Sequence, residues 1–320
     1  MTNIPLSLEK KIVEGGRISS EDAKALWDAD HDELLYHANR LRRRFKGDHI
    51  NVCSILNAKS GRCSEDCRFC AQSAHHKTDV SEYPLVGSKE IEEALRRAKA
   101  SGAGCFGIVT SGRALTPEET EALCSSLDAL KESSIMIGAS LGELDAATLR
   151  RLKDHGVRRF HHNLETGESF FPNICTTHSY AGRVATVRRA KEAGLEVCCG
   201  GLFGLGETRA HRVELAMTLR ELDVDSVPMN FLNPVSGTPM ASVPGLSCRE
   251  ILRTIAVFRF ILPGKDLQLC GGREVNLRDL QSWIFYAGAN GMMIGGYLTT
   301  NGRSVEQDLK MIEDLGLTIK

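Results

Sequence analysis

The sequence lacks several features that would assign it to a large class of proteins. Its 320 residues include 40 lysines and arginines against 41 aspartates and glutamates, which gives a net charge of −1. We therefore expect no basic surface able to hold nucleic acid or an anionic membrane. The longest apolar runs, such as IMIGASLG and IAVFRFIL, are too short to span a bilayer and are interrupted by glycine or by charge.

The first residues, MTNIPLSLEKK, contain no apolar segment of the kind that directs secretion. The chain nevertheless carries 11 cysteines. Without a secretion signal, these thiols indicate a reducing cytoplasm, where cysteines serve metals or chemistry rather than disulfides. We therefore expect a cytoplasmic protein whose cysteines are functional.

The periodicity of the chain predicts its fold class. From residue 49 onward, short apolar runs alternate with segments of helical spacing. Strands are expected at 49–56, 104–110, 135–140, 159–164, 196–203, 226–232, 267–270 and 291–296. Helices are expected between and after them, at 88–102, 116–123, 145–155, 179–194, 208–222, 247–260, 276–288 and 305–315. Such repeated strand–helix units predict an α/β protein of the (β/α)₈ TIM-barrel type, formed by residues 47–320, with residues 1–46 as an N-terminal helical extension.

One motif, CSEDCRFC, places three cysteines within eight residues directly after the first expected strand. Reactive residues of such barrels lie in the loops at the C-terminal ends of the strands, so the position suits a function. Thiolates of Cys63, Cys67 and Cys70 can hold three irons of a cubane cluster and leave the fourth iron open for a substrate. From the residues alone, a zinc site completed by His75 or His76 and a redox pair of Cys67 and Cys70 are alternatives.

The CxxxCxxC spacing resembles that of the radical S-adenosylmethionine (SAM) superfamily, and Phe69, which precedes the last cysteine, matches its pattern. Further stretches are similar to one family within it, the biotin synthases. In chain order they are NAKSGRCSEDCRFCAQS, HHNLETGESFFPNI, RVATVRRAKEAGLEVCCGGLFGLGET, SVPMNFLNPVSGTP, RTIAVFRFILP, GGRE and AGANGMMIGGYLTT. Together they cover nearly the whole chain from residue 50 onward, so the resemblance is specific.

The resemblance implies an activity and a set of cofactors. In this family the open iron of a [4Fe–4S] cluster binds SAM, and an electron cleaves SAM to methionine and a 5′-deoxyadenosyl radical. The radical abstracts hydrogen from unactivated carbon of dethiobiotin, and sulfur from an auxiliary iron–sulfur cluster is inserted to form biotin. The implied partners are dethiobiotin, SAM and an electron donor such as flavodoxin or ferredoxin. Family members are often dimers, which makes a homodimer the candidate assembly.

The resemblance also implies roles for residues that bind SAM. The three motif cysteines hold the cluster and are the catalytic residues. Phe69 corresponds to a residue near the adenine. Glu165 occupies a position whose carboxylate binds the ribose hydroxyls, although the family more often has aspartate there. Arg183 corresponds to an arginine that faces the SAM carboxylate, a charge-assisted pairing.

Substrate-binding residues are expected on two strands. By resemblance, Asn163 and Asn230 bind the ureido ring of dethiobiotin, since an amide offers both a donor and an acceptor. Strand alternation places His161 inward with Asn163 and Glu165, and His162 outward. His161 is therefore a further candidate for substrate contact.

The sequence departs from the family at the auxiliary cluster, which three strand cysteines and one arginine usually hold. Cys198 and Arg273 align with two of these ligands, but Gly107 and Gly138 replace the other two. Unusual cysteines occur nearby, and Cys105 has the same parity as Gly107. Other thiols nearby thus replace the missing ligands, and the two glycines leave more space inside the barrel.

We therefore predict an auxiliary cluster of four irons, of the kind expected in a variant from anaerobes. Its predicted ligands are Cys53, Cys105, Cys198 and Cys270. Arg273 is expected beside the cluster, provided that the strand ends or bulges at the two glycines that follow Cys270. Cys199 has the opposite parity to Cys198 and is the reserve ligand. The alternative is a barrel that lost its second cluster and changed function.

Two other functions remain open from the sequence. One is a radical SAM enzyme of different chemistry on the same scaffold, such as a mutase or a maturase for a metal cofactor. The other is a zinc-stabilised binding barrel without catalytic activity. The remaining cysteines, Cys124, Cys175 and Cys248, are expected to be ordinary buried or surface residues.

Overall fold

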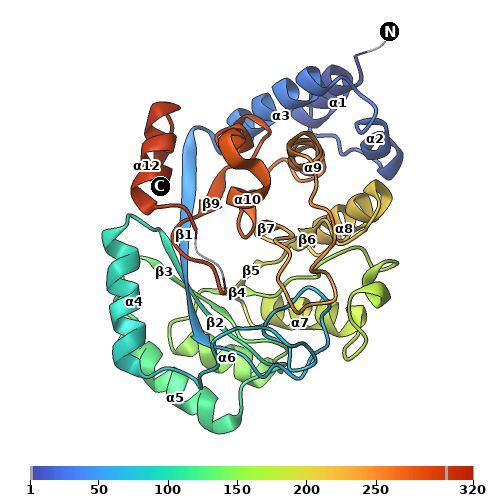
Figure 1. Ribbon diagram of the computed structural model, residues 1–320. Helices are drawn as coiled ribbons and strands as arrows, with labels where there is room; N and C mark the ends of the chain where they lie inside the picture. The colour runs from blue at the N-terminus through green and yellow to red at the C-terminus, as the bar shows by residue number, and fades with distance from the viewer. Residues whose placement is uncertain (1–2, 300–301, 320) are drawn as a thin grey trace.

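The computed structural model describes residues 3–299 and 302–319. At its centre, parallel strands form a closed barrel with helices outside it (Figure 1). The barrel strands are β1 (His49–Lys59), β2 (Cys105–Thr110), β3 (Met136–Ser140), β4 (Arg159–His161), β5 (Glu196–Cys198), β7 (Ser226–Phe231), β8 (Asp266–Leu269) and β9 (Gly291–Met293). They neighbour one another in this order, and β9 pairs with β1 to close the ring. The prediction of a (β/α)₈ barrel is confirmed.

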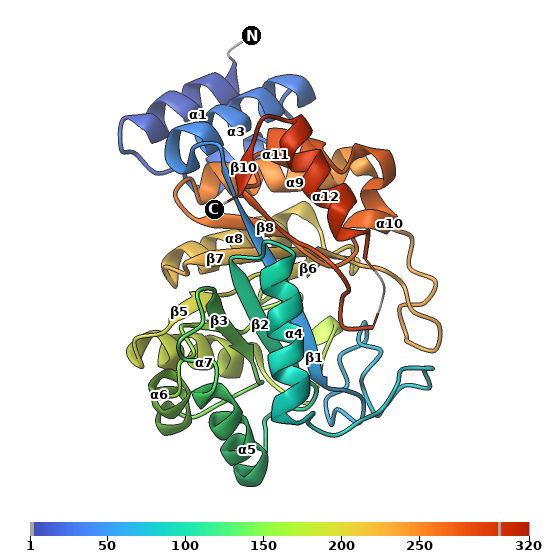
Figure 2. The same cartoon turned by 90° about the vertical axis from the view of Figure 1, so that its left-hand side faces the viewer.

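Three helices precede the barrel: α1 (Ile4–Val13), α2 (Ser20–Ala25) and α3 (His31–Lys46). They pack on α8 (Arg209–Glu221), α9 (Cys248–Ile261) and α11 (Trp283–Tyr286), at one end of the molecule in both views (Figures 1 and 2). Their apolar residues belong to the same hydrophobic core as the barrel. A division of the chain after residue 46 therefore stays a prediction.

The other helices of the described residues are α4 (Ser88–Ala100), α5 (Pro117–Asp128), α6 (Ala146–Asp154), α7 (Tyr180–Glu192), α10 (Arg273–Leu277) and α12 (Val305–Asp314). None of the described helices is both long enough and apolar enough to cross a membrane. Helix α5 has Thr116 as its N-cap, proline at its first position, and a capping box completed by Glu119.

The predicted strand 196–203 is divided into β5 and β6 (Gly201–Phe203). The cause lies on the neighbouring strand, where Pro228 has no backbone N–H to offer. At this point the backbone of Gly200 approaches so closely that a Cβ would lie 2.0 Å from the Pro228 carbonyl oxygen. The predicted strand is thus interrupted at a contact with β7 that its own residues do not reveal.

The prediction of a single helix at 276–288 is wrong. The chain instead forms α10, a 3₁₀ turn at Arg278–Leu280, and the short helix α11. Arg278 has a φ of +50°, which lies outside the helical region and breaks the run. A final strand, β10 (Thr318–Ile319), pairs with the beginning of β1 and was not expected.

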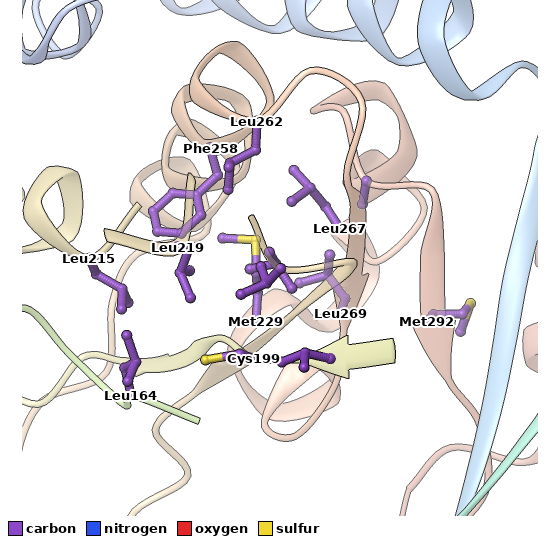
Figure 3. Close-up of a cluster of buried hydrophobic side chains, with 14 of the residues drawn as sticks. Leu164, Cys199, Leu215, Leu219, Met229, Phe258, Leu262, Leu267, Leu269 and Met292 are labelled. Atoms are coloured by element: carbon purple, nitrogen blue, oxygen red, sulfur yellow. The ribbon is translucent and has the colours of Figure 1, made fainter. Parts of the chain in front are cut away.

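The main hydrophobic core fills the space between the strands and the outer helices. Figure 3 shows part of it, where Leu164, Cys199 and Met229 from the barrel wall meet Leu219 and Phe258 from α8 and α9. All five side chains are fully buried. Because this side of the wall is filled by packing, the chemistry is confined to the inside of the barrel.

Candidate active site

The three-cysteine motif lies in the long loop between β1 and α4, and the backbone of this loop folds back on itself. The Cys63 N–H donates to the Gln72 carbonyl at 2.9 Å, and the Cys63 carbonyl accepts from Ala74 at 2.8 Å. The Cys70 N–H donates to the Cys67 carbonyl at 2.9 Å. These bonds give the backbone of the loop a defined shape around the three cysteines.

The thiols of this loop are poorly solvated. Burial raises the pKa of Cys70 to about 11. The hydrogen bond with Cys175, together with burial, raises the pKa of Cys67 well above its usual value. Both are therefore protonated at neutral pH unless a cation compensates the thiolate charge, and a bound metal would do so.

A cavity of about 370 Å³ opens inside the barrel. Ten residues singled out in the sequence line it: Cys53, Phe69, Cys70, Cys105, His161, Asn163, Glu165, Cys198, Asn230 and Cys270. The loop of the motif and the inner faces of the strands thus border one space. Arg183 and Arg273 are not among the described residues that line it, nor are Cys63 and Cys67.

Glu165 is held in an unusual backbone conformation at the wall of the cavity. Its φ is +68°, in the left-handed region, and its carbonyl accepts from the Leu202 N–H at 2.8 Å. A Cβ at position 201 would lie 2.5 Å from this carbonyl, so Gly201 is required there. Burial raises the pKa of the Glu165 carboxyl, although Arg183 opposes the shift.

Arg183 reaches the cavity wall from α7. Its Nη1 donates to the Asn163 carbonyl at 2.8 Å and lies 3.8 Å from the Glu165 carboxylate, while its Nε donates to His178 Nε2 at 2.8 Å. The guanidinium is therefore fixed behind Glu165, where it can attract an anionic group that enters the cavity.

The two asparagines expected to contact substrate are partly occupied by backbone groups. Asn163 Oδ1 accepts from Gly200, and Asn230 Oδ1 accepts from Gly271 at 2.9 Å. Asn230 Nδ2 also donates to Gly201 at 3.2 Å. An amide has two N–H groups and two oxygen lone pairs, so each side chain retains capacity for a ligand in the cavity. The bonds to the backbone fix the orientation of each amide and thus the direction of its remaining N–H groups and oxygen lone pairs.

His161 lines the cavity, as alternation predicts, whereas His162 lies on the outer side and stacks on Phe160. Burial lowers the pKa of His161 to about 4, and Arg159 and Arg183 add to this shift. His161 is therefore neutral at physiological pH and can both donate and accept a hydrogen bond.

The four cysteines predicted as auxiliary ligands meet at the same cavity. Cys53 and Cys105 are direct partners in the register of β1 and β2. Burial raises the pKa of Cys198 to about 12, although Arg159 opposes the shift. Cys199 points outward into the hydrophobic core, as its opposite parity predicts (Figure 3).

Arg273, which is expected beside the auxiliary cluster, does not line the cavity, and its place at the cluster stays a prediction. Strand β8 ends at Leu269, and Gly272, with a φ of +79°, begins α10 and turns the next residue away from the cavity. The Arg273 guanidinium is fully buried and donates to both carboxylate oxygens of Asp308, at 3.1 and 2.8 Å. The Arg273 Nε is buried and has no partner among the described residues.

Two cavity residues were missed. Arg159 is the only arginine or lysine among the described residues that line the cavity. Burial opposes its charge, but the nearby Cys198 and Cys105 raise the pKa of Arg159 above its usual value. Gln268 places its Oε1 3.4 Å from Cys53 Sγ. Strand alternation could have identified both residues, because Arg159 has the same parity as the inward-facing His161 and Gln268 has the same parity as Cys270.

The family is decided by comparison with known proteins. Residues 58–219 match the model of the Radical SAM superfamily, and residues 228–318 match the Biotin and Thiamin Synthesis associated domain. The biotin synthase of Citrifermentans bemidjiense is 54% identical over 96% of this chain and 95% of its own length. That of Geobacter sulfurreducens is 53% identical over 100% of this chain and 99% of its own length. The chain belongs to the biotin synthase family.

Solved structures agree with this fold. Methylornithine synthase (PylB) superposes with a TM-score of 0.84 at 21% identity, covering 98% of this chain and 97% of its own. HydG, a maturase of the [FeFe]-hydrogenase, also gives 0.84, at 16% identity, covering 100% of this chain and 76% of its own. At such identities the likeness concerns the fold alone.

The residues present fit the cofactors of the biotin synthase family, which are a [4Fe–4S] cluster, SAM and an auxiliary iron–sulfur cluster. Thiolates are the donors that iron–sulfur clusters require, and both sets of cysteines supply them. A Cβ at Gly138 would lie 3.8 Å from Cys105 Sγ, so the glycine leaves room beside that thiol. The buried Gln268 Nε2 has no partner among the described residues and can donate to a sulfide of a bound cluster.

Proposed function

We propose a role for each site residue of this chain in the biotin synthase reaction. The chain is a radical SAM enzyme that inserts sulfur into dethiobiotin to form biotin. Cys63, Cys67 and Cys70 hold the SAM-binding cluster, strand cysteines hold the sulfur-donating cluster, and dethiobiotin lies between them. One observation carries this proposal: a single cavity is bordered by Cys70 of the motif loop and by four thiols of the barrel strands.

The groups bound in the cavity supply the radical and the sulfur, which no amino-acid side chain can provide. The protein supplies binding, orientation and exclusion of water. Phe69 borders the adenine of SAM, Glu165 accepts from its ribose hydroxyls, and the fixed guanidinium of Arg183 attracts its carboxylate. Asn163 and Asn230 orient the ureido ring, and the neutral His161 offers a further hydrogen bond.

The auxiliary cluster has four irons and is held by Cys53, Cys105, Cys198 and Cys270. Four thiolates suit a four-iron cluster better than a two-iron cluster with an arginine ligand. The position of Arg159 supports this set, because a cation beside Cys105 and Cys198 offsets the charge of buried thiolates.

Three further parts of the proposal concern the surroundings of the enzyme. The electron comes from a small redox protein such as flavodoxin or ferredoxin, the working assembly is a homodimer, and the location is the cytoplasm. The location is supported by the cysteines, since all 11 are free thiols in the structure.

The test is turnover by the full-length protein, reconstituted with iron and sulfide without oxygen. With SAM and a reductant, the wild type should convert dethiobiotin to biotin and release 5′-deoxyadenosine. Cys67→Ala should cleave no SAM, because a cubane with two protein ligands does not persist.

Two results would contradict the proposed activity and favour another function. Formation of 5′-deoxyadenosine without consumption of dethiobiotin would favour a radical SAM enzyme of other chemistry. About one zinc and no iron in protein purified without oxygen would favour a zinc-stabilised barrel instead.

A further inference from the structure

Cys175 was expected to be an ordinary buried cysteine, but the structure places it against the motif loop. It lies in the loop between the 3₁₀ turn Phe171–Asn173 and α7. Its Sγ is 3.7 Å from Cys67 Sγ and 3.2 Å from His178 Nδ1. The ligand atoms of Cys67, Cys175 and His178 all lie within 4.8 Å of one another. The cluster draws on residues that are more than a hundred positions apart in the chain.

The spacing of these atoms is that of a tetrahedral zinc site. With Zn–S bonds of about 2.3 Å and Zn–N bonds of about 2.0–2.1 Å, two sulfurs lie about 3.8 Å apart and a sulfur and a nitrogen about 3.5 Å apart. The observed distances of 3.7 and 3.2 Å need only small adjustments. Two thiolates and an imidazole are soft ligands that favour zinc over magnesium or calcium.

The surroundings also suit a cation. Cys67 and Cys175 are 9% and 3% exposed, and the side chain of His178 is 4% exposed. Asp66 Oδ1 lies 3.1 Å from Cys175 Sγ, so an oxygen is close enough to serve as a fourth ligand. Two thiolates offset the charge of a divalent cation, so that the cation would not be buried unpaired.

We propose that the cluster-free chain binds one zinc-class divalent cation through Cys67, Cys175 and His178, and that this cation and the [4Fe–4S] cluster exclude each other. Binding releases the two thiol protons to solvent. The exclusion rests on the proposed function, in which Cys67 is a ligand of the SAM cluster, because one thiolate cannot serve both sites. The cation site itself does not depend on that function.

The geometry adds a second consequence, at Arg183. In the structure His178 Nε2 accepts from Arg183 Nε at 2.8 Å, and Nδ1 faces the Glu65 carboxylate at 2.6 Å. Ligation of the metal through Nδ1 leaves the ring proton on Nε2, so His178 can no longer accept from Arg183. A bound cation therefore removes one of the contacts that fix the arginine we assign to the carboxylate of SAM, while Arg183 Nη1 still donates to the Asn163 carbonyl.

The test uses full-length protein freed of iron by a chelator and kept without oxygen. Co²⁺ is the probe, since it reports thiolate ligation by charge-transfer absorption and tetrahedral geometry by intense visible bands. Zn²⁺ is then titrated in competition with a chromophoric chelator. The wild type should bind one cation, and Cys67→Ala, Cys175→Ser and His178→Ala should each weaken binding at least about tenfold.

Cys63→Ala and Cys70→Ala are the matched controls and should bind the cation like the wild type. If these two lose the cation while Cys175→Ser keeps it, the metal sits on the three-cysteine motif and the proposal is wrong. Absence of cobalt binding by the wild type would also overturn it. Circular dichroism of Cys175→Ser, which nearly preserves side-chain size, separates loss of ligand from loss of fold.

The exclusion has its own measurement. Wild-type protein preloaded with zinc should form its SAM cluster more slowly than metal-free protein, as followed by iron–sulfur absorption. Cys175→Ser treated in the same way should form the cluster at the metal-free rate. Equal rates for zinc-loaded and metal-free wild type would refute the exclusion. If neither protein ever forms a cluster, the proposed function fails while the cobalt result still decides the cation site.

Discussion

Arg159 and Arg273 illustrate at the scale of single residues how burial assigns different tasks to one side-chain type. Arg159 faces the cavity and bridges to Glu196 with its Nη2 2.7 Å from the carboxylate. Arg273 faces away, and its pairing with Asp308 leaves both side chains with 0% exposure. The first cation is available to charged groups in the cavity, whereas the second ties α10 to α12 through its bonds to Asp308.

The buried pair gives a stability prediction. Arg273→Met should lower the free energy of unfolding by about 3–5 kcal/mol, because the buried Asp308 loses both of its hydrogen bonds to Arg273 and keeps only Arg303, at 4.0 Å, as a cation nearby. Urea denaturation of the cluster-free protein measures this. Lys310→Ala is the control, since its partners are exposed and its loss should cost less than about 1 kcal/mol. Similar small effects for both variants would show that Asp308 is not dependent on Arg273.

Cys105 gives a prediction about activity. Cys105→Ala should still cleave SAM but lose biotin formation, because it removes a ligand of the sulfur-donating cluster and leaves the motif loop intact. Product analysis by mass spectrometry checks both halves. Cys248→Ala is the control, as that thiol contacts the Asn276 carbonyl outside the cavity. Biotin formation by Cys105→Ala at the wild-type rate would count against this ligand set.

At the scale of elements, the family resemblance supplied most of the site, and strand alternation supplied side-chain directions. Alternation placed Cys105 and His161 inside the barrel and His162 and Cys199 outside, because side-chain direction along a strand is a local property. What it could not provide are contacts between distant segments. The division of β5 from β6 depends on Pro228 of β7, and the orientation of Arg273 depends on Asp308 of α12.

The close contact of Gly200 with β7 gives a prediction at this scale. Gly200→Ala should destabilise the protein by about 1–3 kcal/mol, since its Cβ would overlap the Pro228 carbonyl and push two barrel strands apart. Thermal unfolding checks this against Gly264→Ala, whose Cβ meets no atom within 4 Å. Equal melting temperatures of the two variants would mean that the strands adjust without strain.

At the scale of the whole molecule, we propose two metal centres within one barrel, one at the three-cysteine loop and one at the four strand thiols. Fully loaded protein should contain about eight irons per chain, and a variant lacking Cys63, Cys67 and Cys70 about four. Iron and sulfide analysis with Mössbauer spectra of anaerobic samples measures this. A count near four in the loaded wild type would leave the strand thiols without a cluster.

The barrel ring closes between its first and its last strands, and this bears on biosynthesis. Asn51 of β1 pairs with Gly291 of β9, and His49 pairs with Thr318 of β10. A ribosome must therefore add more than two hundred residues after β1 before its second edge can be covered. Until then the nascent chain exposes an unpaired, apolar strand edge, the kind of surface that aggregates and that chaperones bind. Long-range closure of this kind is also slow, so the yield of active enzyme should depend on protection of β1 during translation.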